Sequence, residues 1–123
     1  MSVPAGFSLV SRFQEHETPF LSPAKIGEFF GFRIQDLAER AHVHRNAPTA
    51  RPQTPQLQKY LQDLIRVFAV AEVMTGDRKK AVFLLRNEPL RAFAYKTADA
   101  LIQEGRADDV IAYLESLAGG AAG

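Results

Sequence analysis

Apolar residues recur at helical spacing in separate stretches of the chain. Ser22-Pro23 predicts the start of a first helix, because a Ser hydroxyl caps free N–H groups and Pro at the first helical position lacks only a donor that would be unpaired anyway. Gly31 predicts the end of this helix. A second helix follows, whose apolar residues have the i, i+3, i+4, i+7 spacing of one buried stripe: Ile34, Leu37, Ala38 and Ala41.

The longest apolar pattern runs from about Pro55 to Thr75. Thr54 can cap this helix, and Gly76 predicts its end. Its apolar residues, among them Leu64 and Phe68, occupy more than one stripe. Two explanations are open: the helix lies at the centre of the core, or it is shared with a second subunit.

The rest of the chain predicts three shorter helices. Asp77 caps the first, which gives way around residues 87–89, and Thr97 caps the second. The third begins near Ala107, and the tail 119–123 is expected to fray. No stretch alternates like a strand. We therefore expect an all-α fold, a helix-turn-helix-like bundle with a long central helix and a small C-terminal helical unit.

Length and composition limit the organisation. A chain of 123 residues has the size of one ordinary domain. We divide it into an N-terminal arm (1–21), a helix-turn-helix-like region with the long helix (22–76) and a C-terminal unit with a flexible tail (77–123). Cysteine is absent, which fits a reducing compartment, and no stretch has the length and apolar character of a membrane span. The cytoplasm is the expected location.

Residues 37–46 have the layout of a helix-turn-helix. The first residues of the second helix in such a unit enter the major groove, where Arg and Asn read base edges. His42 replaces the Gly favoured in the turn, and Pro48 falls at the fourth helical position if His44 is the cap. Two interpretations of this unit are open: it contacts DNA, or it keeps the helix-turn-helix fold as a scaffold and has lost most of its base readout. The candidate DNA-binding residues are His44, Arg45, Asn46, Thr49 and Arg51.

Net charge and motifs argue against other chemistry. The chain has 15 Lys and Arg against 14 Asp and Glu, so any nucleic-acid surface must be local. Residues 41–62 contain no Asp or Glu. No nucleophile elbow or phosphate loop is present, and His42 with His44 supplies only two of the roughly four ligands of a structural zinc site. We expect no catalytic residue, no metal and no cofactor.

The order of these features resembles the Xre/MbcA/ParS-type antitoxins over roughly residues 20 to 120. Two positions depart from the pattern: Phe83-Leu84-Leu85 stands where members often have Trp, and Thr97 where they often have Pro. The resemblance is carried by Leu37-Ala38, Val43-His44-Arg45-Asn46, Thr75-Gly76-Asp77, Asn87 with Leu90, Lys96-Thr97-Ala98-Asp99-Ala100-Leu101, Gly105, Val110 and Gly119-Gly120.

The resemblance implies a type II antitoxin whose C-terminal unit binds a toxin. The usual partner has a RES domain, similar in fold to ADP-ribosyltransferases, and consumes NAD by degrading it or by transferring its ADP-ribose. A homodimer and binding to operator DNA are further expectations, and a stand-alone dimeric helix-turn-helix regulator is the alternative. The expected toxin contacts are Lys96, Arg106, Tyr113, Leu114, Leu117, Gly119 and Gly120.

Overall fold

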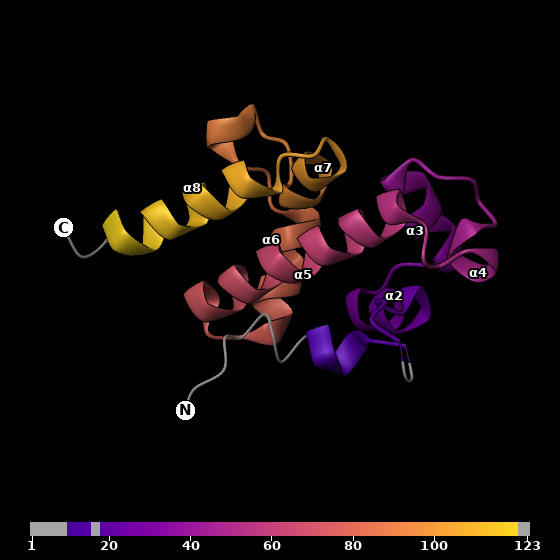
Figure 1. The fold of residues 1–123 in the computed structure, drawn as a ribbon. Helices are drawn as coiled ribbons and strands as arrows, with labels where there is room; N and C mark the ends of the chain where they lie inside the picture. The colour runs from indigo at the N-terminus through magenta and orange to yellow at the C-terminus, as the bar shows by residue number, and fades with distance from the viewer. Residues whose placement is uncertain (1–9, 16–17, 121–123) are drawn as a thin grey trace. The chain divides into compact units, whose positions relative to one another are not determined.

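The computed structural model describes residues 10–15 and 18–120, which are mostly helical (Figure 1). Within them no strand forms, and β-pairing is limited to isolated bridges from Gln14 to Leu21 and from Leu90 to Lys96. The all-α prediction is confirmed. The elements are α2 (Pro23–Phe30), α3 (Ile34–Ala41), α4 (Ala47–Ala50), α5 (Pro55–Thr75), α6 (Arg78–Asn87), the 3₁₀ turn η1 (Arg91–Phe93), α7 (Ala98–Gln103) and α8 (Ala107–Gly120).

The chain forms two compact units that divide between Ile65 and Arg66, inside α5. Gln58 holds the first part of α5 in the first unit, since its side-chain amide accepts from the Leu21 N–H and donates to the Leu21 carbonyl. Arg66 forms an ion pair with Asp108 of α8 in the second unit. The predicted boundary at residue 76 therefore marks the end of a helix and lies within the second unit.

The long helix is buried on most of its sides between Leu57 and Ala71. Leu64 and Phe68 share a buried face, as predicted, with 0% and 1% of their surface exposed. The width of the apolar pattern is thus accounted for within one chain, and homodimerisation stays a prediction. The buried apolar residues of α5 are Leu57, Tyr60, Leu61, Leu64, Ile65, Val67, Phe68, Ala69 and Ala71.

In the first unit, α2 begins and ends where the sequence predicts. The Ser22 hydroxyl accepts the Lys25 N–H, and Gly31 has the left-handed φ of 78°. The segment before α2 does not behave as a free arm in its described part. Phe13 and Leu21 are buried, and the Phe13 carbonyl accepts the Ser22 N–H at 2.7 Å. Apolar burial draws this part of the predicted arm into the core.

In the second unit, the predicted caps form. The Asp77 carboxylate accepts the Lys80 backbone N–H at the start of α6, and this bond lowers the pKa of Asp77. The Thr97 hydroxyl accepts the Ala100 N–H at the start of α7. The last helix continues through Gly120, the last described residue, since glycine weakens a helix without forbidding it; fraying of the tail stays a prediction. None of the described helices is long and apolar enough to cross a membrane.

Replacing Leu64 by Ala should lower the free energy of unfolding by about 2–5 kcal/mol, because Leu64 is fully buried and the smaller side chain leaves a cavity that the surroundings fill only in part. Urea denaturation measures the change. Val73→Ala is the control on the same helix: Val73 is 76% exposed, and its loss should change stability by less than about 0.5 kcal/mol. Equal effects would contradict the assignment of Leu64 to the core.

Gly27→Ala should destabilise the chain by about 1–3 kcal/mol, since a Cβ at Gly27 would lie 2.7 Å from the Phe32 carbonyl oxygen. Gly119→Ala is the matched control, because a Cβ there meets nothing within 4 Å. Its expected effect is nil or a gain of up to about 1 kcal/mol in stability. Thermal melts of both variants test the pair, and a neutral Gly27→Ala would show that the close approach is absent.

Candidate functional site

The helix-turn-helix predicted at residues 37–46 forms only in part. His42 takes the left-handed conformation, with φ 59° and ψ 41°, at the turn position where Gly is favoured. The following helix, α4, has Asn46 as its N-cap, so Pro48 is its second residue and does not take the fourth position that a cap at His44 would give it. The Nδ1 atom of His44 instead accepts the Asn46 backbone N–H at 3.1 Å.

The second helix of this unit is a single turn of four residues. Pro48 lies in its first turn, where the missing N–H leaves no hydrogen bond unmade. Arg51, before Pro52, has φ −140° and ψ 61°, outside the helical region, because a following proline disfavours α conformation. At about 1.5 Å per residue such a helix is about 6 Å long, and it presents few side chains to a major groove.

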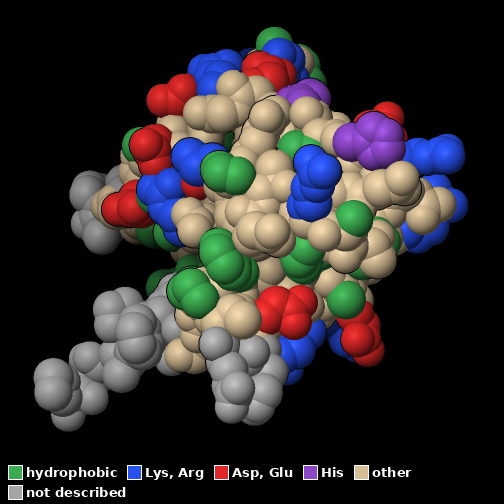
Figure 2. All heavy atoms as spheres, turned by 45° about the vertical axis from the view of Figure 1, so that its right-hand side comes forward, with side chains coloured by type: hydrophobic (Ala, Val, Ile, Leu, Met, Phe, Trp, Pro, Cys, Tyr) green, Lys and Arg blue, Asp and Glu red, His purple; other side chains and the backbone are tan. Residues whose placement is uncertain are grey.

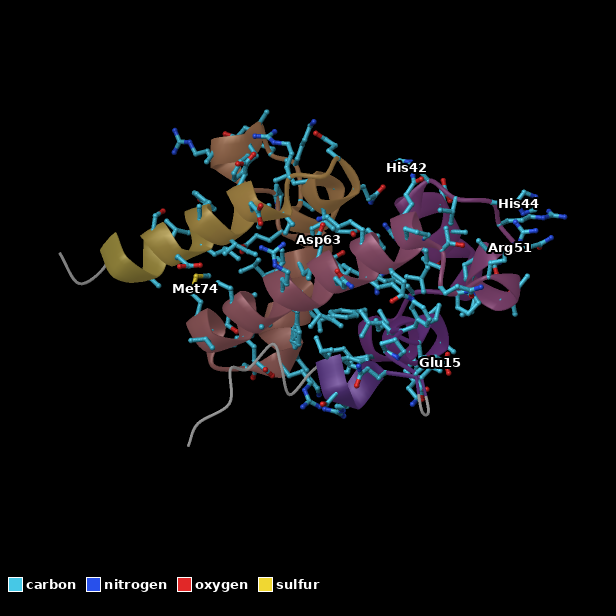
Figure 3. The ribbon with its side chains drawn as sticks, viewed as in Figure 1. Glu15, His42, His44, Arg51, Asp63 and Met74 are labelled. Atoms are coloured by element: carbon cyan, nitrogen blue, oxygen red, sulfur yellow. The ribbon has the colours of Figure 1, made fainter. Side chains whose placement is uncertain are left out.

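A hollow of about 670 Å³ is lined by the turn after α3, by α4 and by the start of α5. Figure 3 labels three of its residues, His42, His44 and Arg51, and Figure 2 shows histidine side chains at the surface near Lys and Arg side chains. Of the five predicted DNA-binding residues, all are exposed, and three line the hollow. The full lining is His42, Val43, His44, Asn46, Ala47, Ala50, Arg51, Thr54 and Gln56.

In the second unit, predicted toxin contacts converge on Phe93. The Phe93 ring packs edge-on against Tyr113, with centroids 5.4 Å apart, and the Arg106 guanidinium lies 5.2 Å from its centroid. The Lys96 N–H donates to the Phe93 carbonyl at 3.1 Å. We call Phe93, Lys96, Arg106 and Tyr113 the Phe93 cluster.

The charges of the Phe93 cluster are balanced locally. Lys96 pairs with Glu104 at 2.7 Å, and Arg106 pairs with Asp109 at 3.0 Å. All four side chains are 40% exposed or more, so each pair contributes little to stability. The surface therefore combines aromatic rings with paired charges and has no excess of one sign among these four groups.

Next to this cluster, Ala94 and Tyr95 are both left-handed, with φ 55° and 66°. Two bonds of 2.9 Å close the loop: the Leu90 carbonyl accepts the Tyr95 N–H, and the Leu90 N–H donates to the Lys96 carbonyl. The left-handed conformation is unfavourable for residues with a Cβ by about 1–2 kcal/mol each. The loop holds the Tyr95 side chain 65% exposed.

The remaining predicted toxin contacts divide along α8. Leu114 is 1% exposed, so its assignment as a contact is corrected: it is a core residue. Leu117 is 47% exposed, and it lies one turn beyond Tyr113. Gly119 is an exposed helical residue, and Gly120 is the last residue of α8. The rest of the expected flexible tail, 121–123, lies outside the described residues.

Sequence reasoning missed Phe93 and Tyr95. Neither residue belongs to a helical period, and Ala94-Tyr95 lacks the Gly or Asn that marks a left-handed turn. The only signal was the pair of aromatic residues between Pro89 and the Thr97 cap.

Among the described residues, no three His, Cys, Asp or Glu side chains gather in a group that could hold a metal ion. The sequence matches no protein-family model, and comparisons with curated proteins and with solved structures gave no significant match. The two surfaces are therefore interpreted from their own chemistry.

Ala94→Gly and Tyr95→Gly should each raise the free energy of unfolding by about 0.5–1 kcal/mol, because Gly adopts positive φ without the Cβ penalty but loses more entropy on folding. Urea denaturation checks both variants. A loss of stability in Ala94→Gly, which removes only a methyl group, would contradict the strain assigned to this loop.

Proposed function

We propose that this chain is the antitoxin of a type II toxin–antitoxin system, which binds a NAD-consuming toxin of the RES-domain type and occludes its active site. The proposal rests on the resemblance of residues 20 to 120 to the Xre/MbcA/ParS-type antitoxins. The observation that carries it is the exposed Tyr95, held on a left-handed loop beside the Phe93 cluster.

A strained, exposed aromatic residue fits a binding role better than a packing role. Unfavourable backbone conformations persist where surrounding structure fixes them, and they are frequent at ligand clamps. Tyr95 makes little use of its ring within the chain, because 65% of its surface is exposed. Tyrosine is among the residues that contribute most to protein–protein affinity, and a loop already closed by hydrogen bonds lowers the entropy lost on binding.

The charge balance around Tyr95 fits the proposed partner. A cleft that binds the diphosphate of NAD has to be locally electropositive, and unpaired cations would be repelled from it. Lys96 and Arg106 are each paired with a carboxylate, which lowers that repulsion. Occlusion of a cleft requires no catalytic group from this chain.

A stand-alone DNA-binding regulator is supported less well, because α4 has only four residues for base readout. We also expect the antitoxin to regulate its own operon and to form a homodimer. Light scattering at micromolar concentration tests the dimer: a 13.6 kDa species alone would contradict it.

Tyr95→Gly and Ala94→Gly separate binding from stability, since each removes the Cβ penalty of one left-handed residue and only Tyr95→Gly removes the ring. Each variant is co-expressed with the protein encoded by the adjacent gene, and affinity is measured by calorimetry. Tyr95→Gly should weaken binding at least tenfold and lose growth rescue, whereas Ala94→Gly should bind within about twofold of the unchanged chain.

Two results would contradict this account in different ways. If the unchanged chain neither copurifies with the adjacent gene product nor slows its NAD consumption, the antitoxin proposal is wrong. If it does both and Tyr95→Gly behaves like the unchanged chain, the function stands and the contact surface lies elsewhere.

A further inference from the structure

We propose that the hollow at residues 42–56 binds a small phosphate ester of nucleotide size. This site lies in the first unit, whereas the residues proposed to bind the toxin lie in the second unit. The inference therefore goes beyond the antitoxin function and does not depend on it.

The size and lining of the hollow suit such a ligand. Its volume of about 670 Å³ falls within the roughly 300–1,000 Å³ of small-molecule sites. Val43, Ala47 and Ala50 supply apolar surface for an uncharged part of the ligand. Thr54 and Gln56 add polar side chains to the same wall.

Charge complementarity points to an anion. Arg51 lines the hollow, and its planar guanidinium can donate two parallel hydrogen bonds to a phosphate. All 14 Asp and Glu residues of the chain lie outside residues 41–62, so no carboxylate of this stretch opposes a bound phosphate. Carboxylates are the side chains that would most strongly repel it.

Local hydrogen bonds prepare a second donor. Because His44 Nδ1 accepts the Asn46 N–H, Nε2 is the ring nitrogen left to donate to a ligand oxygen. Gln56 Nε2 donates to the carbonyls of Ala41 at 3.0 Å and His42 at 3.2 Å. These bonds tie the turn after α3 to the first turn of α5, and both of these segments line the hollow.

A small ligand is favoured over a nucleic-acid duplex. Affinity for a duplex comes largely from Lys and Arg side chains that neutralise several phosphates along the backbone. Residues 41–62 provide only Arg45, Arg51 and Lys59, and Lys59 is paired with Asp63. Of these three, only Arg51 lines the hollow, and one cation suits a ligand with one or two phosphate groups better than a duplex.

The test uses ADP as the probe, with calorimetric titration of the full chain. Arg51→Gln and Arg45→Gln each remove one positive charge, but only Arg51 lines the hollow. ADP affinity should fall at least tenfold in Arg51→Gln and stay within about twofold in Arg45→Gln. Inorganic phosphate should compete with ADP, and adenosine, which lacks phosphate, should bind at least tenfold more weakly.

Amide chemical shifts locate the bound probe: ADP should perturb residues 42–56 in the first unit and leave residues 90–96 unchanged. Three results would overturn the proposal. The first is an equal loss of ADP affinity in both Arg variants. The second is the absence of saturable ADP binding up to millimolar concentration in a chain whose thermal melt is cooperative. The third is tight, salt-dependent binding of a DNA duplex that ADP does not compete away.

Discussion

The burial of α5 is the constraint on which the rest of the fold depends. Between Leu57 and Ala71 this helix has few positions that face water, so any polar group placed there needs a partner within the chain. Gln58 and Asp63 are the buried polar residues of this segment, and each has a partner within the chain. The Gln58 side chain donates to the backbone carbonyls of Leu21 and Pro52, and Asp63 forms an ion pair with Lys59. The polar contacts of Gln58 also connect α5 to the segments before α2 and α5.

α5 supplies core residues to both units, and each unit carries a candidate surface of different chemistry. In the first unit, a hollow is lined by the turn after α3, by α4 and by the start of α5. Residues 41–62, which include all of its lining residues, contain no Asp or Glu. In the second unit, η1 and the loop after it place Tyr95 beside the Phe93 cluster, where cations are paired. We therefore propose different ligands for them: a small anion for the first surface and the cleft of a protein partner for the second.

The helix boundaries could be predicted because the signals that set them are local. A Ser, Asp or Thr cap and a left-handed Gly act within a few residues, as at Ser22, Thr97 and Gly31. The length of α5 followed from Pro55 and Gly76 for the same reason.

The candidate sites were less accessible to sequence reasoning because they depend on contacts between elements. Leu114 and Leu117 belong to one apolar stripe, and only packing shows that the first is core and the second exposed. The positive φ of Tyr95 has no signal in its residue type, and it occurs in a loop closed by two hydrogen bonds to Leu90. The hollow likewise depends on Gln56, a polar residue without a motif, which ties two elements together.

Hydrogen–deuterium exchange of the chain, alone and with the protein encoded by the adjacent gene, tests the central claim most directly. The claim is that the second unit binds the partner through the loop of Tyr95 and the Phe93 cluster. The account predicts slower exchange at residues 90–97 and along the exposed side of α8 in the complex, with residues 42–51 unchanged. Protection confined to residues 42–51, or a complex without protection at residues 90–97, would contradict it.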